Sequence, residues 1–544
     1  IIHVILSYLD KNSLVAVSQS CQTLKLVSYS SNLWRNDVLD LSIKSLRKVT
    51  ELTIHSLVER RISTLKVVDA YTDDNSKEAS KSHRHSNMAQ HVKQLIPKFQ
   101  TIMGDNIKMI LWSIGSQSKM EISMLTQFTS LTSLVLVHTV QVKAFKEIHV
   151  KLSEVFTALV NLERLVLLVG VDACTKALQA EDPRANENEF SYENYLTKVT
   201  NRLPKLRDIT LGKIFWDYYA MREIGLAGTK YNSELPPPPE IIGENVVRLA
   251  ITEGLLGAIG LHHLSKFFPN VRHLVLLHPR EHSEQHTIRS TDTQLPALLD
   301  SFCFLESLEL GDIERIEGDF MPFIPPNVKA LRLRGCLSSG LLSTMSLSTL
   351  MSRSAANLTV LEIAVPKLLD QKYHFYNNEC KHKILSNLCN AIRELPKLEI
   401  LIMSRLQILH NGCYSALLDM GDEFNFCIQE QAKSLKSVIG VELPCRSLLP
   451  PNLRFITTAC GEGDDPLQPV LLQRSQSNLA DWKTVSENSI DWHIAHGTAQ
   501  FYIDRQVTKQ NEIIETFVQR ETRSRRRHFV SIYAIRFRDY EMYW

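Results

Sequence analysis

The chain has 544 residues, of which 44% are hydrophobic, so it can bury a large core without disulfide bridges or metal ions. Its 61 lysines and arginines nearly balance 59 aspartates and glutamates, so charge gives no argument for nucleic acid or a membrane as a partner, and we find neither a bilayer-spanning apolar run nor a signal peptide. Ten scattered cysteines without a C-x-x-C pair favour a reduced protein, which we expect in the cytoplasm, the nucleus or both.

The first 41 residues predict two short amphipathic helices. Residues 10–13 predict a turn with helix-capping side chains between them, and Leu33-Trp34 follows as a large apolar anchor. Such short helices need a partner surface, either on this chain or on another protein. The helical spacing is carried by two sets of side chains: Ile2, Ile5, Leu6 and Leu9, then Leu14, Val17, Ser18 and Cys21.

The order and gaps of these residues resemble an F-box. The resembling features are Ile5-Leu-Ser-Tyr-Leu-Asp10, Leu14, Val17-Ser-x-x-Cys21 and Leu33-Trp34. The family's opening Leu-Pro would precede Ile1, and Leu24 stands where an aromatic residue is usual.

The resemblance implies that residues 1–41 dock onto the Skp-type adaptor of a cullin–RING ubiquitin ligase, with Trp34 as the strongest contact. The alternative is an ordinary helical cap that covers the first repeat of a solenoid. By this resemblance the adaptor-binding side chains would be Ile5, Leu6, Leu9, Leu14, Val17, Leu33 and Trp34.

Residues 42–106 form a connecting region with a polar linker at 72–91. A first strand is predicted at Leu65-Lys-Val67, and residues 107–112 predict a degenerate repeat strand.

A repeated apolar motif dominates residues 107–460. Its clearest copy is Val328-x-x-Leu331-x-Leu333-x-x-Cys336. Alternation at period two places the apolar side chains on one face of a short strand, and only stacked copies can bury that face. Further copies begin at Leu131, Leu162, Leu206, Val271, Leu305, Leu358, Leu398 and Leu453.

This pattern resembles leucine-rich repeats of irregular length, with helical patterns between the strands at 145–159, 192–199 and 384–395. We therefore predict an α/β leucine-rich-repeat solenoid with parallel strands on the concave side, helices on the convex side and an N-terminal helical F-box.

Apolar residues also point to the opposite side of several strands. We weigh two interpretations: an apolar strip that receives a protein substrate or the C-terminal segment, and strands that loops and helices bury on both faces. The residues concerned are Val135, Val137, Val166, Leu168, Val275, Leu277, Ile400 and Ile402.

Three charges, Glu309, Arg332 and Glu362, take equivalent outward positions on consecutive repeats. A solvated ladder worth a few tenths of a kcal/mol per pair is one interpretation. The other is a substrate contact in which Arg332 and Arg334 favour an acidic or phosphorylated target.

No motif for a cofactor, a phosphate-binding loop or a catalytic nucleophile with its base is present, so we expect a non-catalytic protein without a cofactor. His278, His282 and His286 would align in a helix, but Pro279 and the position after a strand favour a loop over a metal site.

Residues 461–544 lie beyond the last repeat and predict a cap for the far end of the stack. They contain Trp482, Trp492 and a strand-like alternation at 529–537. A basic cluster at 520–527 fits either a nuclear import signal or a solvated charged run.

Together these patterns predict the substrate-recognition subunit of a Skp–cullin–F-box ubiquitin ligase, which binds the adaptor through residues 1–41 and an unknown protein target through the repeats. The alternative is a leucine-rich-repeat interaction scaffold without a ligase role, for example a regulator of a small GTPase.

Overall fold

The structure is a computed structural model that describes residues 2, 6, 11–34, 38–40, 58, 60–68, 101, 104–114, 122–140, 154–171, 203–211, 243–252, 265, 268–277, 299–311, 323–334, 357–366, 389–390, 392–393, 395–406, 426–429, 434–440, 443, 449–460, 468–475, 481–485, 490–496, 513–514 and 517. The chain divides into two compact units. The first unit is Ile1–Phe215 with Lys509–Phe529, and the second is Trp216–Thr508 with Val530–Trp544.

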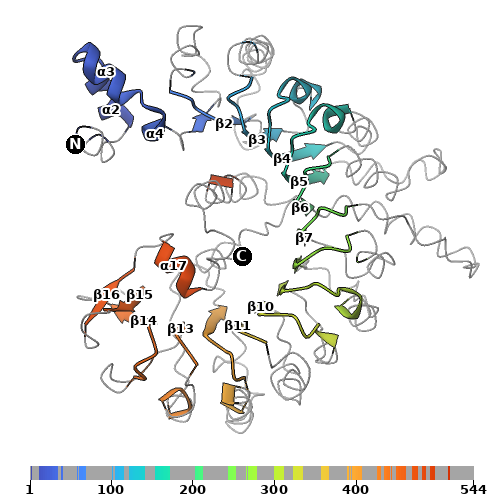
Figure 1. Ribbon diagram of the computed structural model, residues 1–544, viewed down its shortest axis with the longest axis vertical. Coiled ribbons are helices and arrows are strands. Elements are labelled where there is room, and N and C mark those ends of the chain that lie inside the picture. Colours follow the sequence, from blue (N-terminus) through green and yellow to red (C-terminus); the bar gives the residue numbers. More distant parts are fainter. Residues whose placement is uncertain are drawn as a thin grey trace, which may run out of the picture. The chain divides into compact units, whose positions relative to one another are not determined.

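The first unit begins with short helices and continues as a parallel sheet (Figure 1). The helices are α2 (Lys11–Ser18), α3 (Gln22–Ser28) and α4 (Ser31–Trp34), and a 3-10 helix, η2, spans Ile122–Gln127. The parallel strands, each paired with the next, are β1 (Val38–Asp40), β2 (Thr64–Val68), β3 (Met109–Ile114), β4 (Ser133–Val140), β5 (Arg164–Val171) and β6 (Asp208–Leu211).

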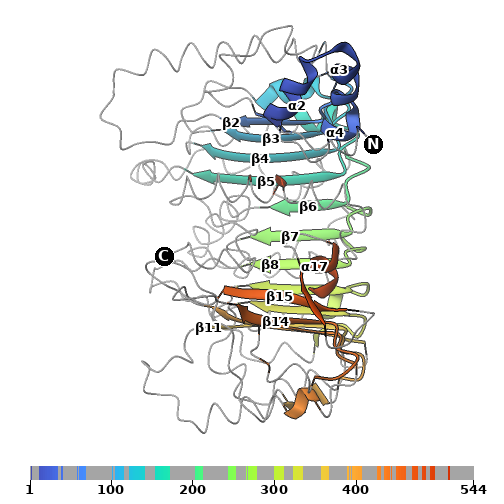
Figure 2. The same ribbon diagram turned by 90° about the vertical axis from the view of Figure 1, so that its left-hand side faces the viewer.

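The second unit stacks further repeat strands (Figure 2) and ends in two antiparallel pairings, β14 with β15 and β15 with β16. Its last helix is α17 (Ile490–Ala495). The strands are β7 (Arg248–Thr252), β8 (His273–Leu277), β9 (Ser307–Gly311), β10 (Ala330–Arg334), β11 (Val360–Pro366), β12 (Ile400–Leu406), β13 (Ser437–Ile439), β14 (Phe455–Cys460), β15 (Gln468–Arg474) and β16 (Trp482–Thr484).

The predicted stack of parallel repeat strands is confirmed for the described residues. The strands expected at 65–67 and 107–112 are β2 and β3. Sequence analysis did not identify β7 and β13 as repeats, because their copies of the motif, Val246-x-x-Leu249-x-Ile251 and Leu435-x-x-Val438-x-Gly440, keep one leucine each. Helical turns at 154–158 and at 389–390 agree with the helices predicted at 145–159 and 384–395. In Figure 1 the helical turns of the repeats lie on the outer side of the strands.

One main-chain arrangement recurs at the start of the repeat strands: the carbonyl of one repeat accepts two N–H groups from the next. Glu306 O accepts from Lys329 N at 2.8 Å and Ala330 N at 3.1 Å, and Lys329 O accepts from Thr359 N at 2.8 Å and Val360 N at 2.9 Å. Both N–H groups belong to the first residues of the next repeat strand. Because one carbonyl binds the two of them, it fixes the register of that strand against the preceding repeat.

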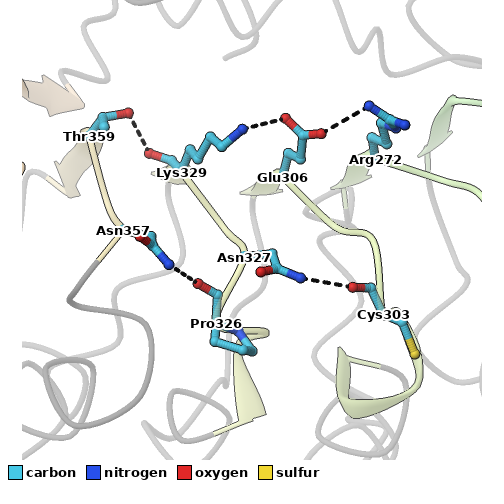
Figure 3. Close-up of polar contacts among 8 residues, drawn as sticks. All are labelled: Arg272, Cys303, Glu306, Pro326, Asn327, Lys329, Asn357 and Thr359. Atoms are coloured by element: carbon cyan, nitrogen blue, oxygen red, sulfur yellow. Dashed lines mark hydrogen bonds and ion pairs between the residues drawn. The ribbon is translucent and has the colours of Figure 1, made fainter.

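Asparagine side chains add a second link between successive turns (Figure 3). Asn327 Nδ2 donates to Cys303 O at 3.1 Å, and Asn357 Nδ2 donates to Pro326 O at 3.1 Å. The same link joins Asn161 to Thr129 O, Asn270 to Glu244 O and Asn452 to Leu435 O. The asparagine directly before the first apolar residue of the motif is therefore part of the repeat.

The turn before several strands is filled by a phenylalanine three residues ahead of the motif. Phe128, Phe268 and Phe302 are each at most 1% exposed. Gly243 takes this position before β7. A Cβ atom there would lie 2.7 Å from Phe268 Cδ1 and 2.9 Å from Val246 Cγ2, so the Phe268 ring of the next repeat already fills the space.

We expect Gly243→Ala to lower the free energy of unfolding by about 1–3 kcal/mol, because overpacking forces neighbouring side chains out of their rotamers. Urea unfolding of the full chain measures this cost. Phe268→Leu removes the Cε1 atom that lies 2.8 Å from the added Cβ, so the double variant should cost less than the sum of the single variants. If the costs of the two single variants simply add in the double variant, the Phe268 ring is not what makes a larger residue at position 243 unfavourable.

Figure 3 also shows a row of charges at the starts of three strands. Glu306 lies between Arg272, whose Nη1 is 3.2 Å from Oε1, and Lys329, whose Nζ is 3.0 Å from Oε2. Burial acts to raise the pKa of Glu306, but the hydrogen bond from Lys329 and the charges of Lys329 and Arg272 outweigh it, so this pKa lies below the usual 4.5.

Since the pKa of Glu306 is depressed in the folded state, its contribution to stability is present above about pH 4.5 and is lost as the pH falls through the folded-state pKa. Glu306→Gln should therefore lower stability by about 0.5–1 kcal/mol at pH 7 and by much less at pH 3. Urea midpoints at both values, repeated in high salt to screen the row, measure the effect. An equal loss at both pH values would exclude the carboxylate as its cause.

Several predictions from sequence fall outside the described residues: the polar linker 72–91, the helix at 192–199, the three histidines from 278 to 286, the basic cluster 520–527 and the strand at 529–537. Within the described ranges, no cluster of three or more metal-ligating side chains occurs. No helix described here combines the length and apolarity needed to span a membrane.

Candidate interaction surfaces

The N-terminal helices are organised around Trp34. Its indole Nε1 donates to Ser28 O, and the Arg60 guanidinium lies 4.2 Å from the Trp34 ring and 4.4 Å from the Tyr29 ring. Trp34 is 3% exposed, and Leu6 and Leu14 are each 4% exposed. These three side chains pack inside the unit, and their predicted contact with an adaptor stays a prediction.

The boundaries of the N-terminal helices also differ from the prediction. Residues 11–13 belong to α2 and are not a turn, and α2 ends at Ser18, whose hydroxyl donates to Val15 O at 2.6 Å. Cys21 does not continue that helix. Its Sγ accepts from Leu24 N at 3.4 Å and so caps the start of α3.

An apolar surface nevertheless stays open on these helices. Leu26 of α3 is 71% exposed and Ile2 is 48% exposed. Val17 and Leu33, two of the predicted adaptor contacts, are half-buried. The side chains of Ile5 and Leu9 lie outside the described residues. The N-terminal helices therefore combine a packed interior with an accessible leucine and isoleucine.

In the first unit, the outward apolar residues of β4 and β5 are covered. Val135 pairs with Val166 and Val137 with Leu168, and all four are at most 1% exposed. The C-terminal stretch Lys509–Phe529 belongs to this unit, and Figures 1 and 2 show its short helical part, in red, facing β5. This burial favours strands covered on both faces over an open docking strip.

In the second unit, the outward face of β10 and β11 carries a buried ion pair. Arg332 Nη1 lies 2.5 Å from Glu362 Oε2, and the two residues are 4% and 3% exposed. Glu309 flanks Arg332 in register on β9. The expected solvated ladder is thus corrected for Arg332 and Glu362, because the C-terminal segment covers them.

The covering element is α17, together with His496. Arg332 Nη2 donates to His496 O at 2.9 Å, and Ser437 Oγ donates to Ala495 O at 2.7 Å. Ala495 is 0% exposed and packs in a cluster with Ile402, Ile439, Phe455, Leu471 and Val485. Figure 1 shows α17 beside β13. In this unit, the C-terminal segment occupies part of the outward face.

The remaining candidates on this face differ in burial. Val275 is 7% exposed, Ile402 is 0% exposed and Ile400 is half-buried. The side chains of Leu277 and Arg334 lie outside the described residues.

The last strands end the parallel stack. β15 pairs antiparallel with β14, and Arg474 at its end donates to Pro450 O at 2.8 Å and stacks 4.7 Å from the Trp482 ring. Burial lowers the pKa of the Arg474 guanidinium. An antiparallel pair with a stacked arginine covers an edge that would otherwise offer unpaired backbone groups.

Sequence analysis missed the residues that join the C-terminal segment to the repeats, namely Ser437, Ala495 and His496. Ser437 lies in an unrecognised repeat, and α17 is too short for a helical period to stand out. No local pattern links Arg332 to a carbonyl 164 residues away.

Comparisons with known proteins leave the family open. No protein-family model matches the chain, and no curated protein matches it. Among solved structures, it is similar to the leucine-rich repeat-containing protein LegL7 from Legionella pneumophila, with 12% identity, a TM-score of 0.30, and coverage of 60% of this chain and 93% of that chain.

It is also similar to the Rad7 and Elc1 complex in yeast, with 14% identity, a TM-score of 0.30, and coverage of 79% of this chain and 98% of that chain. At that TM-score neither likeness supports an argument about function. The repeat architecture rests on the strand register and hydrogen bonds described above.

Removing one partner of the buried pair should be costly. We expect Arg332→Met to lower the free energy of unfolding by about 3–5 kcal/mol, because it leaves the Glu362 carboxylate buried without its guanidinium. The double variant Arg332→Met/Glu362→Leu should be less destabilised than Arg332→Met alone. Denaturant unfolding of the three proteins gives the comparison.

Lys436→Met is the matched control. Lys436 Nζ lies 2.6 Å from Glu399 Oε1, but both side chains are largely exposed, at 49% and 42%, so its loss should cost less than about 1 kcal/mol. Equal costs for Arg332→Met and Lys436→Met would mean that the Arg332 site is solvated.

Proposed function

We propose that this chain is the substrate-recognition subunit of a Skp–cullin–F-box ubiquitin ligase, with the N-terminal helices bound to a Skp-type adaptor. The observation that carries the proposal is the apolar surface left on those helices. Leu26 is 71% exposed and Ile2 is 48% exposed, although the neighbouring Trp34 is packed inside. In this proposal Leu26 and Ile2 belong to one apolar contact surface, since contiguous exposed apolar patches mark sites where proteins bind one another.

The repeats would hold the target. Stacked repeats present a long continuous face, which suits recognition of an extended or helical segment of another protein. The subunit would act by proximity: it would raise the local concentration of target lysines near a ubiquitin-charged enzyme. It would perform no bond chemistry itself and would need no cofactor.

The second candidate is an interaction scaffold without a ligase role, for example a regulator of a small GTPase. It is favoured by the burial of Leu6, Leu14 and Trp34, since these are the side chains by which the F-box resemblance implied docking. In that case the N-terminal helices would be a cap, and the exposed Leu26 would be an isolated surface residue.

Co-expression of the full chain with a Skp-type adaptor separates the two candidates. We expect the pair to co-purify, and Leu26→Asp to weaken binding by at least about tenfold, because a charge would be buried at the interface. The Trp34→Ala change is unsuitable as a test, since Trp34 is core and its loss would unfold the helices.

Val160→Asp is the control, because Val160 is 47% exposed on a turn of the same unit and should leave adaptor binding unchanged. Thermal unfolding should show that both aspartate variants remain folded. An adaptor that does not bind the wild-type chain, or binds Leu26→Asp equally well, would favour the scaffold.

A further inference from the structure

We infer that Arg60 is a positioning residue, whose guanidinium fixes the orientation of the N-terminal helices against the first complete repeat strand, β2. This rests on the proposed function, in which the helices hold the adaptor and the repeats hold the target. It goes further by naming the residue that sets how the adaptor-bound helices are turned relative to the repeats.

Arg60 lies directly before the repeat that contains β2. It stands two residues ahead of Ile62, the first apolar residue of the motif copy at 62–67. Ile62 is 3% exposed, and Ser63 O accepts two N–H groups from the start of β3, as the shared carbonyls of later repeats do. The backbone that carries Arg60 is therefore anchored to the repeat stack.

The side chain of Arg60 contacts the ends of two N-terminal helices. Tyr29 is the C-terminal cap of α3, and Trp34 is the last residue of α4. The guanidinium carbon lies 4.4 Å from the centre of the Tyr29 ring and 4.2 Å from that of the Trp34 ring. Because a cation over an aromatic ring is attracted in a defined geometry, a rotation of either helix against β2 would break one of these contacts.

The first repeat departs from the later copies in order to place this side chain. Arg60 and Arg61 take the positions that later copies give to proline and to the linking asparagine. Arg61 has a φ of 54°, in the left-handed region that side-chain-bearing residues seldom adopt. A turn that serves only the repeat needs neither arginine. The prolines at the position of Arg60 are Pro204, Pro269, Pro326, Pro396 and Pro451.

The guanidinium is kept at this place despite a second cost. Arg60 Nε is buried without a hydrogen-bond partner, and an unpaired buried donor lowers stability. A methionine could fill similar space without that cost, but it would slide over the rings, since apolar contact has no preferred direction. Backbone strain and unpaired buried groups concentrate where a geometry matters for function. The Arg60 contact therefore supplies direction, which packing alone does not.

The test measures the orientation itself in the full chain. Nitroxide labels are attached through a ketone-bearing unnatural amino acid at Gln19 and Val160, which are both exposed, and the native cysteines stay unlabelled. Double electron–electron resonance should give one narrow distance distribution for the wild type. In Arg60→Met we expect the distribution to be at least about twice as wide, because the helices then sample several orientations. An unchanged width would refute the positioning role.

Arg61→Met is the matched control. It removes the same charge from the neighbouring exposed residue, whose side chain has no described ring contact, so the width should stay that of the wild type. Equal widening in both variants would assign the effect to net charge. Tyr29→Leu is the second variant: it keeps Trp34 and Arg60 and removes one ring, so it should also widen the distribution. Thermal unfolding checks that each variant is folded.

A second readout connects the orientation to the ligase. In an assembly of the chain with a Skp-type adaptor and its cullin–RING enzyme, self-ubiquitination of the wild type should fall on a restricted set of lysines. Arg60→Met should spread it over more lysines while adaptor affinity stays unchanged, since Leu26 is untouched. An identical lysine pattern would show that the orientation does not control transfer. Absence of adaptor binding by the wild type would refute the ligase assignment alone, because the label distances are measured without the adaptor.

Discussion

The structure depends on one constraint: each repeat must satisfy the backbone groups of the next. A single carbonyl at the start of a strand, such as Glu306 O or Lys329 O, accepts two N–H groups from the following repeat. An insertion can lengthen a loop without breaking this pair of bonds, which explains how repeats of irregular length keep one strand register. The asparagine links and the buried phenylalanines of the turns serve the same junction.

The outward face of the strands follows from that register. The motif leucines are buried on one face of the sheet, so the residues between them point to the opposite face. Neighbouring strands then place these outward residues side by side. In the second unit this brings Arg332 and Glu362 together and under α17. A buried ion pair adds little net stability, so its value here lies in positioning a guanidinium donor for a carbonyl.

The N-terminal helices pack inside the unit a side chain that the F-box resemblance assigns to docking. An F-box resemblance names Trp34 as a contact, yet the ring lies between the Ser28 carbonyl and the Arg60 guanidinium. Three short helices cannot be stable without a core, and the tryptophan, as their largest side chain, supplies much of it. The apolar residues that remain accessible are those that this core does not use, and Leu26 is the most exposed of those described.

The sequence by itself determined the stack of parallel strands and its inward face. The reason is that the alternation of apolar residues at period two is a local property, and each copy of the motif shows it independently. It was also enough to predict β2 and β3 outside the regular copies. Only the tertiary structure decided that Trp34 is core, that Cys21 caps a helix and that α17 covers Arg332 and Ser437. Those outcomes depend on contacts between different segments of the chain. The spacing of residues within one segment cannot predict which carbonyl or ring from another segment will contact it.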